Sequence, residues 1–187
     1  MIYSIVAYGD AVLKKKAVEI DQKNTEINLP KLIEDMYETM YEANGVGLAA
    51  PQIGMGIRLF VIDSTRMEDD ELMGVKKAFI NPTILEESGE KWAFEEGCLS
   101  IPNVRENVYR QPKIKIHYFD ENWNEFTHEF DKMTARVIQH EYDHIEGVLF
   151  TDLLSSFKKT LLKSKLNGIS RGNVKVDYRM KFPDGKR

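Results

Sequence analysis

Apolar residues recur with a helical period near the beginning of the chain. Between residues 28 and 45 they follow one stripe of a helix with about 3.6 residues per turn: Leu29, Leu32, Ile33, Met36 and Met40. Asn28 can cap the start of this helix, and Asn44 with Gly45 can end it. The pattern therefore predicts an N-terminal helix followed by a glycine-containing loop.

The middle of the chain alternates between apolar and polar positions, which is typical of strands. The pattern predicts a strand over residues 57–62 and further strands within 76–97, around a turn at 88–89. Residues 113–130 have the pattern of a hairpin that turns at 120–124. The middle third is therefore expected to form antiparallel strands.

Helical spacing returns later in the chain. Apolar residues at Met133, Val137 and Ile138 predict a helix over residues 133–147. A second helix is expected over residues 153–168, and residues 172–180 have the composition of a final strand.

The order of these elements is one helix, many antiparallel strands, and then helices, which indicates an α+β fold. We expect antiparallel strands packed around a central helix, with an N-terminal helix and a C-terminal helix on either side of them. The length of 187 residues fits one domain of about 100–200 residues. No internal repeat or linker is evident, so residues 1–187 are expected to form a single catalytic domain.

The composition describes a globular protein, with 42% hydrophobic and 30% charged residues. No apolar stretch reaches the length of about 18 residues that a membrane helix needs, and the first residues do not resemble a secretory signal. Cys98 is the single cysteine, so no internal disulfide can form. These features favour a reducing cytoplasm.

Charge is distributed unevenly along the chain. Residues 158–187 contain ten basic and two acidic residues, a net charge of +8, whereas the chain as a whole carries −4. A basic end on an acidic body can contact nucleic acid. The simpler interpretation is a solvated helix face and tail, because runs of charge commonly only keep a surface wet.

The segment "HEYDH", residues 140–144, carries the strongest chemical signal. On a helix, His140 and His144 lie on one face, so both imidazoles can reach one metal ion. Glu141 lies next to this pair, where it can act as a general base towards water at the metal. Asp143 either orients a neighbouring group or is an exposed helix acid. The alternative for the whole segment is a surface helix that carries two histidines by chance.

A catalytic metal site needs about three protein ligands and one open position, so a third ligand is required. Phe150 stands where the metzincin pattern would place a histidine, and no glutamate follows Glu146. His117 and His128 are expected on the polar face of the hairpin. Cys98 remains, and two imidazoles with one thiolate suit Zn²⁺ or Fe²⁺. The alternative for Cys98 is a buried small apolar residue.

The loop after the first helix has the spelling G-x-G-x-x-A, which dinucleotide-binding loops share. Such a loop must follow a strand and open a helix, but here it follows a helix. We therefore expect no nucleotide cofactor. The glycines indicate a close approach of some other group, because glycine has no Cβ.

Three segments together resemble the motifs of one enzyme family. "GVGLAAPQ" (45–52), "EGCLS" (96–100) and "QHEYDH" (139–144) are similar in order and spacing to the motifs of bacterial-type peptide deformylases. The resemblance extends from about residue 3 to residue 165. It implies that Cys98, His140 and His144 bind one divalent metal ion. In that family the ion is typically Fe²⁺, and Zn²⁺, Ni²⁺ or Co²⁺ can replace it.

The same resemblance implies the roles of other residues. Glu141 would be the general base and acid, Gln52 would donate its amide N–H to the oxyanion, and the backbone N–H of Leu99 would be the second donor. The implied reaction removes the formyl group from the N-terminal formyl-methionine of newly made polypeptides and releases formate.

The resemblance also implies a binding site for the peptide. Val46, Gly47, Met133 and Val137 would line an apolar slot for the methionine side chain, and Arg105 would lie near the substrate. Ordinary core packing is the alternative for Met133 and Val137, and a solvent-facing position is the alternative for Arg105.

The expected partners are N-formyl-methionyl nascent polypeptides and, through the basic C-terminal region, weak contact with ribosomal RNA. No membrane association is expected. One rival function is a metalloendopeptidase, which shares the H-E-x-x-H motif. The other is a metal-binding or nucleotide-binding module without enzymatic activity.

Overall fold

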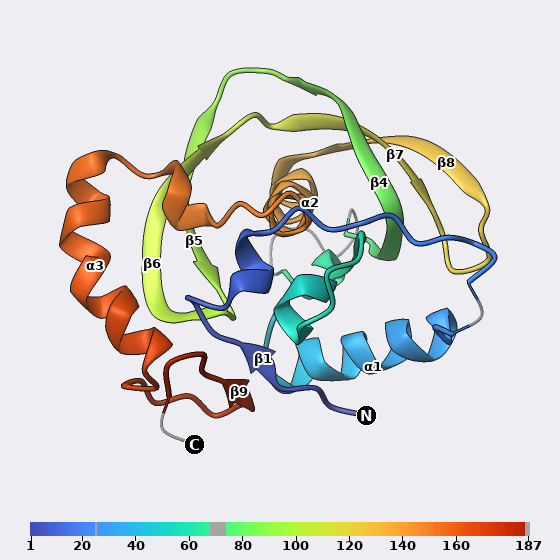
Figure 1. Cartoon of the computed structure of the whole chain (residues 1–187). Helices are drawn as coiled ribbons and strands as arrows, with labels where there is room; N and C mark the ends of the chain where they lie inside the picture. The colour runs from blue at the N-terminus through green and yellow to red at the C-terminus, as the bar shows by residue number, and fades with distance from the viewer. Residues whose placement is uncertain (25, 68–73, 186–187) are drawn as a thin grey trace.

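The computed structural model describes residues 1–24, 26–67 and 74–185 (Figure 1). Within these residues the helices are α1 (Leu29–Glu42), α2 (Lys132–Ile145) and α3 (Ser156–Ser170). The strands are β1 (Ile5–Val6), β2 (Gly47–Ala49), β3 (Leu59–Asp63), β4 (Lys76–Ser88), β5 (Trp92–Cys98), β6 (Ile101–Arg110), β7 (Lys113–Phe119), β8 (Glu125–Asp131) and β9 (Met180–Lys181). Short 3₁₀ turns are η1 (Ala11–Lys14), η2 (Ala50–Ile53), η3 (Ser64–Arg66) and η4 (Phe150–Leu153).

The strands described by the structure form three sheets. The largest has the order β2-β3-β4-β7-β8 with every neighbouring pair antiparallel. β5 and β6 form an antiparallel pair, and β1 and β9 form a parallel pair. In Figure 1, α2 is viewed along its axis in the middle of the molecule, with β4, β7 and β8 on one side and β5 and β6 on the other. This arrangement confirms the expected α+β fold with antiparallel strands around a central helix.

The core of the described residues forms three clusters, and one of them lies between α2 and the five-stranded sheet. Phe79 on β4 stacks on Phe60, with ring centroids 4.8 Å apart, and contacts the tilted ring of Tyr118, whose centroid is 4.4 Å away. Ala135 and Ile138 on α2 are fully buried in the same cluster. Close-packed aromatic rings of this kind leave little freedom to move. The sheet therefore provides a fixed platform for the central helix.

The N-terminal helix follows the expected pattern. All five residues of its apolar stripe are buried, and Asn28 caps the helix by accepting a hydrogen bond from the backbone N–H of Lys31 at 3.1 Å. The helix ends two residues before Asn44, whose φ is +54°. The glycine-containing loop thus follows a helix, as the sequence indicated.

The expected C-terminal helix is confirmed, but its bounds and the strand after it differ from the expectations. The last helix spans Ser156–Ser170 rather than 153–168, because its turn of positive φ is at Gly172 and not at Gly168. The N–H groups of Gly172 and Asn173 close the helix by donating to Ile169 at 3.0 Å and Gly168 at 2.8 Å. Residues 172–180 do not form a strand along their length. Only Met180 and Lys181 pair, because their partner strand β1 is two residues long.

The strands before α2 were only partly foreseen. β4 ends at Ser88 and Gly89 has φ +91°, which confirms the turn at 88–89. However, β4 and β5 enter different sheets, and β5 pairs instead with β6. β6 was not predicted, because Pro102 and several charged residues interrupt the alternation in its sequence.

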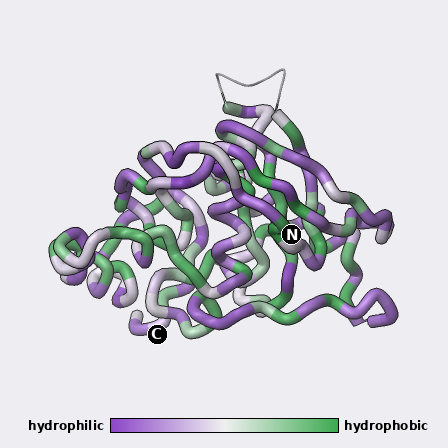
Figure 2. Tube along the Cα trace, turned by 90° about the horizontal axis from the view of Figure 1, so that it is seen from above, coloured by the Kyte–Doolittle hydropathy of each residue, from purple (hydrophilic) through white to green (hydrophobic). Residues whose placement is uncertain are grey.

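Figure 2 shows short hydrophobic stretches that alternate with hydrophilic ones along the trace. Among the helices that the structure describes, none has the length and apolar character needed to cross a membrane.

Candidate metal centre

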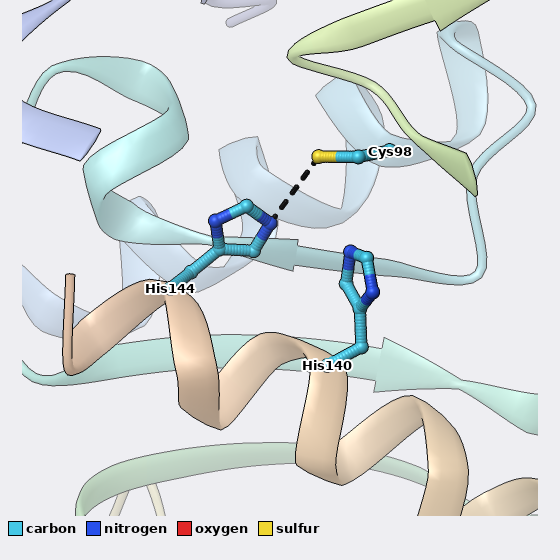
Figure 3. A group of neighbouring side chains, drawn as sticks. All are labelled: Cys98, His140 and His144. Carbon is cyan, nitrogen blue, oxygen red and sulfur yellow. Dashed lines mark hydrogen bonds between the residues drawn. The ribbon is translucent and has the colours of Figure 1, made fainter. Parts of the chain in front are cut away.

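Two elements bring the three expected ligands together. His140 and His144 are one turn apart on α2, and Cys98 ends β5 and faces them (Figure 3). The Nε2 atom of His144 lies 3.3 Å from the Sγ atom of Cys98. One ligand atom from each of the three residues lies within 4.8 Å of the other two. The helical i, i+4 spacing and the end of the strand therefore create a compact group of one sulfur and two imidazole donors.

This group fits a divalent transition metal. Thiolate and imidazole are the donors that Zn²⁺ and Fe²⁺ accept in proteins. Glu141 is 4% exposed, and its Oε2 atom is buried without a hydrogen-bond partner among the described residues. A buried carboxylate oxygen without a partner is costly, so its presence beside the donors indicates that the site is completed by a bound group.

A buried carboxylate holds His140 in position. Glu96 on β5 accepts from Arg110 through Nε at 2.8 Å and Nη2 at 3.0 Å, and from Nη1 of Arg136 at 2.7 Å. Its Oε1 atom also lies 2.9 Å from Nδ1 of His140. Arg110 in turn donates to Asp143 at 2.8 Å. Because Nδ1 of His140 is engaged by a carboxylate, Nε2 is left for a metal.

Burial and neighbouring charges shift the pKa values of Glu96, Glu141 and Asp143. Burial by itself would raise the pKa of Glu96, but the hydrogen bonds from His140 and Arg110 outweigh it and hold that pKa well below its usual range. Burial raises the pKa of Glu141 to about 7, against the opposing charge of His140. Burial also raises the pKa of Asp143, although Arg110 opposes this. Glu96 is therefore a fixed negative charge, whereas Glu141 is suited to exchange a proton near neutral pH.

The loop after α1 and the turn η2 complete the other side of the site. Gln52 is 1% exposed, and its Oε1 atom accepts from the backbone N–H of Ala49 at 2.9 Å. This bond directs Nε2 towards Ser100, at 3.3 Å, and the sulfur of Cys98, at 3.6 Å. A Cβ atom placed on Gly47 would lie 2.4 Å from Oε1 of Glu141. The glycine is thus needed so that the start of β2 can approach that carboxylate closely.

Gly47, Gln52, Cys98, His140 and Glu141 line one cleft of about 870 Å³. The residues expected to contact substrate also line it: Val46, Gly47, Arg105, Met133 and Val137. Val137 lines the cleft and, at 7% exposed, also belongs to the buried core. Arg105 lies at the rim, with its side chain 67% exposed and Nη1 3.9 Å from Glu95.

Three other candidates from the sequence, His117, His128 and Asp143, lie outside the metal-donor group. His117 bonds to Glu125 at 2.7 Å on the hairpin β7–β8, and His128 is exposed and bonds to Tyr118 at 2.9 Å. Both therefore lie on the hairpin as expected and are not part of the metal-donor group. Asp143 is not an exposed helix acid, because it binds Arg110.

Comparison with known proteins shows which protein family this chain is similar to. The family described as polypeptide deformylase matches residues 2–160. The chain belongs to the polypeptide deformylase family. A peptide deformylase of Christiangramia forsetii is 57% identical, covering 100% of this chain and 99% of the relative, and one of Cytophaga hutchinsonii is 58% identical, covering 98% of each. The crystal structure of a peptide deformylase from Legionella pneumophila superimposes with a TM-score of 0.80 at 36% identity, covering 92% of this chain and 98% of that one.

The deformylase assignment settles the reaction. The enzyme is a metal-dependent hydrolase that removes the N-terminal formyl group from formyl-methionine of newly made polypeptides and releases formate. It is therefore neither a metalloendopeptidase nor a binding module without activity.

The sequence alone did not single out several residues of this deformylase site. Glu96 begins the quoted segment EGCLS, but strand alternation could not relate it to Cys98, because the pairing of β5 with β6 is irregular between Gly97 and Cys98. Arg110 is 14 residues from Glu96 in the chain and Arg136 is 40 residues away. No local pattern could have joined these two arginines to that carboxylate.

Replacement of Glu96 tests the buried network. Glu96→Gln keeps the volume but leaves Arg110 and Arg136 without a full negative partner, and breaking a buried ion pair typically costs about 3–5 kcal/mol. We expect a loss of that size in the free energy of unfolding, measured in urea. Weaker orientation of His140 should also lower metal affinity by about 10–100-fold.

A matched control lies one residue away on the same strand. Glu95 is exposed, so Glu95→Gln should change the stability by less than about 0.5 kcal/mol. Equal stability of the two variants would contradict the role given to the Glu96 network.

Proposed function

We propose that Cys98, His140 and His144 hold one divalent metal ion and that Fe²⁺ is its physiological identity. The compact sulfur and imidazole donor set supports such an ion, and the family resemblance favours Fe²⁺, with Zn²⁺, Ni²⁺ or Co²⁺ able to occupy the same donors. When bound, the ion supplies Lewis acidity towards water and the formyl oxygen.

In this proposal Glu141 transfers a proton from the attacking water to the departing amine. Its Oε2 atom takes a proton from the attacking water and later delivers it to the nitrogen of the departing amine. The single observation that carries this role is the buried, unpartnered Oε2 atom beside the three metal donors. Burial also raises the pKa of Glu141 to about 7, which suits both directions of the transfer near neutral pH.

Gln52 and Leu99 stabilise the charge that develops on the formyl oxygen. The amide of Gln52 is held by Ala49 so that Nε2 is directed towards Cys98, and the backbone N–H of Leu99 is the second donor. A donor that is fixed in advance costs no reorganisation during the reaction, and loss of one typically reduces the rate about 10²–10³-fold.

The cleft supplies the binding site for formyl-methionyl peptides. Val46, Gly47, Met133 and Val137 form its apolar slot for the methionine side chain, and Arg105 at the rim contacts the peptide that follows. The lining runs from Glu42, at the end of α1, to Tyr178 near the end of the chain. This supports the proposal that residues 1–187 act as one catalytic domain.

Weak docking to ribosomal RNA is proposed for the basic C-terminal region. Lys159 and Lys163 are four residues apart on α3, and both are exposed. A cluster of positive charge is attracted to phosphate and releases counterions on binding. Because the substrates are newly made polypeptides, we propose that the enzyme acts in the cytoplasm.

Removal of the proposed general base separates chemistry from metal binding. Glu141→Gln keeps the size of the side chain but cannot accept the proton, so turnover of formyl-Met-Ala-Ser should fall by at least about 10²-fold. Metal content should stay the same, because Glu141 is not among the three ligands. Formate release and metal content are measured on one sample, and a variant with near-full turnover would show that the general base is another group.

A second variant tests the close approach of the loop to Glu141. In Gly47→Ala the new Cβ would overlap the carboxylate, so Glu141 must move and kcat should fall by about 10²-fold. Gly56→Ala is the matched control, because its Cβ would meet its nearest neighbour at an ordinary 3.9 Å. Equal kcat for the wild type and Gly47→Ala would contradict the proposed positioning.

Ribosome contact is tested by pelleting at increasing salt. Retention of the wild type should fall as salt rises, and Lys159→Ala with Lys163→Ala should weaken it and reduce the salt dependence. Lys23→Ala with Lys113→Ala removes the same charge from other elements and should leave retention close to that of the wild type. Retention that does not respond to salt would refute the electrostatic docking.

A further inference from the structure

The segment that follows α3 returns to the catalytic cleft. The family match ends at residue 160, yet four residues beyond it line the cleft: Lys175, Val176, Asp177 and Tyr178. In Figure 1 this dark red segment turns back from α3 and brings β9 beside β1. A part of the chain outside the family match therefore forms one wall of the active site.

The segment between Ser170 and Arg179 is anchored at both ends. The Oγ atom of Ser170 donates to Asp184 at 2.9 Å, and the N–H of Asp184 donates to the carbonyl of Ser170 at 3.0 Å. On the other side, the N–H groups of Ile5 and Ala7 donate to Arg179 and Lys181, both at 2.9 Å. The residues between these anchors are thus held against the cleft.

One side chain of the segment reaches the backbone beside the metal ligand Cys98. The hydroxyl of Tyr178 donates to the carbonyl oxygen of Leu99 at 2.8 Å. Tyr178 and Leu99 are both partly buried and pack against the core cluster that contains α1. The next carbonyl, that of Ser100, accepts from the N–H of Tyr8 at 2.8 Å. Two successive carbonyls after Cys98 are therefore fixed.

We propose that Tyr178 is a positioning residue for deformylation, acting through the backbone of Leu99. This inference rests on the role proposed above for the Leu99 N–H. A residue has only two soft backbone torsions. Cys98 restrains the chain before Leu99, and the Tyr178 hydroxyl restrains the carbonyl after it. Together they set the direction of the N–H that meets the formyl oxygen.

A positioning role for Tyr178 differs from two simpler roles in which measured quantity it changes: stability, KM or kcat. A purely structural tyrosine would affect stability but not kcat. A tyrosine that only bound peptide would affect KM. Loss of positioning for an oxyanion donor acts on the transition state, so it lowers kcat and leaves KM nearly unchanged.

Tyr178→Phe is the direct test, because it retains the ring and removes only the hydroxyl. With formyl-Met-Ala-Ser as substrate we expect kcat to fall about ten-fold, since small misplacements of catalytic groups are costly. KM should stay within about two-fold and metal content should match that of the wild type. The backbone amide resonance of Leu99 should shift in the ¹⁵N–¹H spectrum, which is a readout independent of activity.

Ser170→Ala is the matched control. It removes a hydroxyl that bonds within the same C-terminal region but does not touch Leu99. The backbone bond from Asp184 to Ser170 and the pairing of β9 with β1 still hold the segment, so kcat should be that of the wild type. The inference is overturned if Tyr178→Phe keeps full kcat, if only KM rises, or if the loss of kcat follows a loss of metal. An equal loss of kcat in Ser170→Ala would also overturn it, because general loosening of the tail would then be the cause.

Failure of this inference is distinguishable from failure of the proposed site. If the wild type releases formate and Glu141→Gln does not, the proposed general base stands whatever Tyr178→Phe does. Full kcat in Tyr178→Phe would then remove only the positioning role.

Discussion

The carboxylate of Glu96 joins the two halves of the active site. It is 6% exposed and binds two arginines and a histidine that come from β6 and α2. Charges buried to this degree are tolerated only when they are paired and fully hydrogen-bonded. The network therefore fixes the distance between the strand that ends in Cys98 and the helix that carries both histidines. The proposed metal site depends on that distance.

The central place of α2 explains how distant segments meet at one cleft. The helix packs on the five-stranded sheet through Ala135 and Ile138 and presents its opposite side to β5 and β6. The loop after α1 can then approach Glu141, because position 47 is glycine. The C-terminal segment closes another wall and reaches the backbone beside Cys98 through Tyr178. Gln52, Glu96 and Tyr178 are thus each held by hydrogen bonds to other elements of the fold.

Local sequence patterns predicted those features whose residues lie only a few positions apart in the chain. The i, i+4 spacing of His140 and His144 and the apolar stripe of the N-terminal helix are of this kind. Cys98 emerged from eliminating other ligands and from the family resemblance. The arginines around Glu96 could not be found in this way, because their contacts span 14 and 40 residues. The tail escaped prediction for a related reason: it is held by side chains and by a two-residue strand, and neither has a periodic pattern.

The central claim is that this donor set makes a metal-dependent deformylase. It is tested most directly by purifying the protein without oxygen and measuring bound metal and formate release from formyl-Met-Ala-Ser on the same sample. Turnover should rise in proportion to bound metal up to one ion per chain, with iron as the ion found, and it should disappear when a chelator removes the ion. Formate release that is independent of metal content, or peptide-bond cleavage without formate, would contradict the claim.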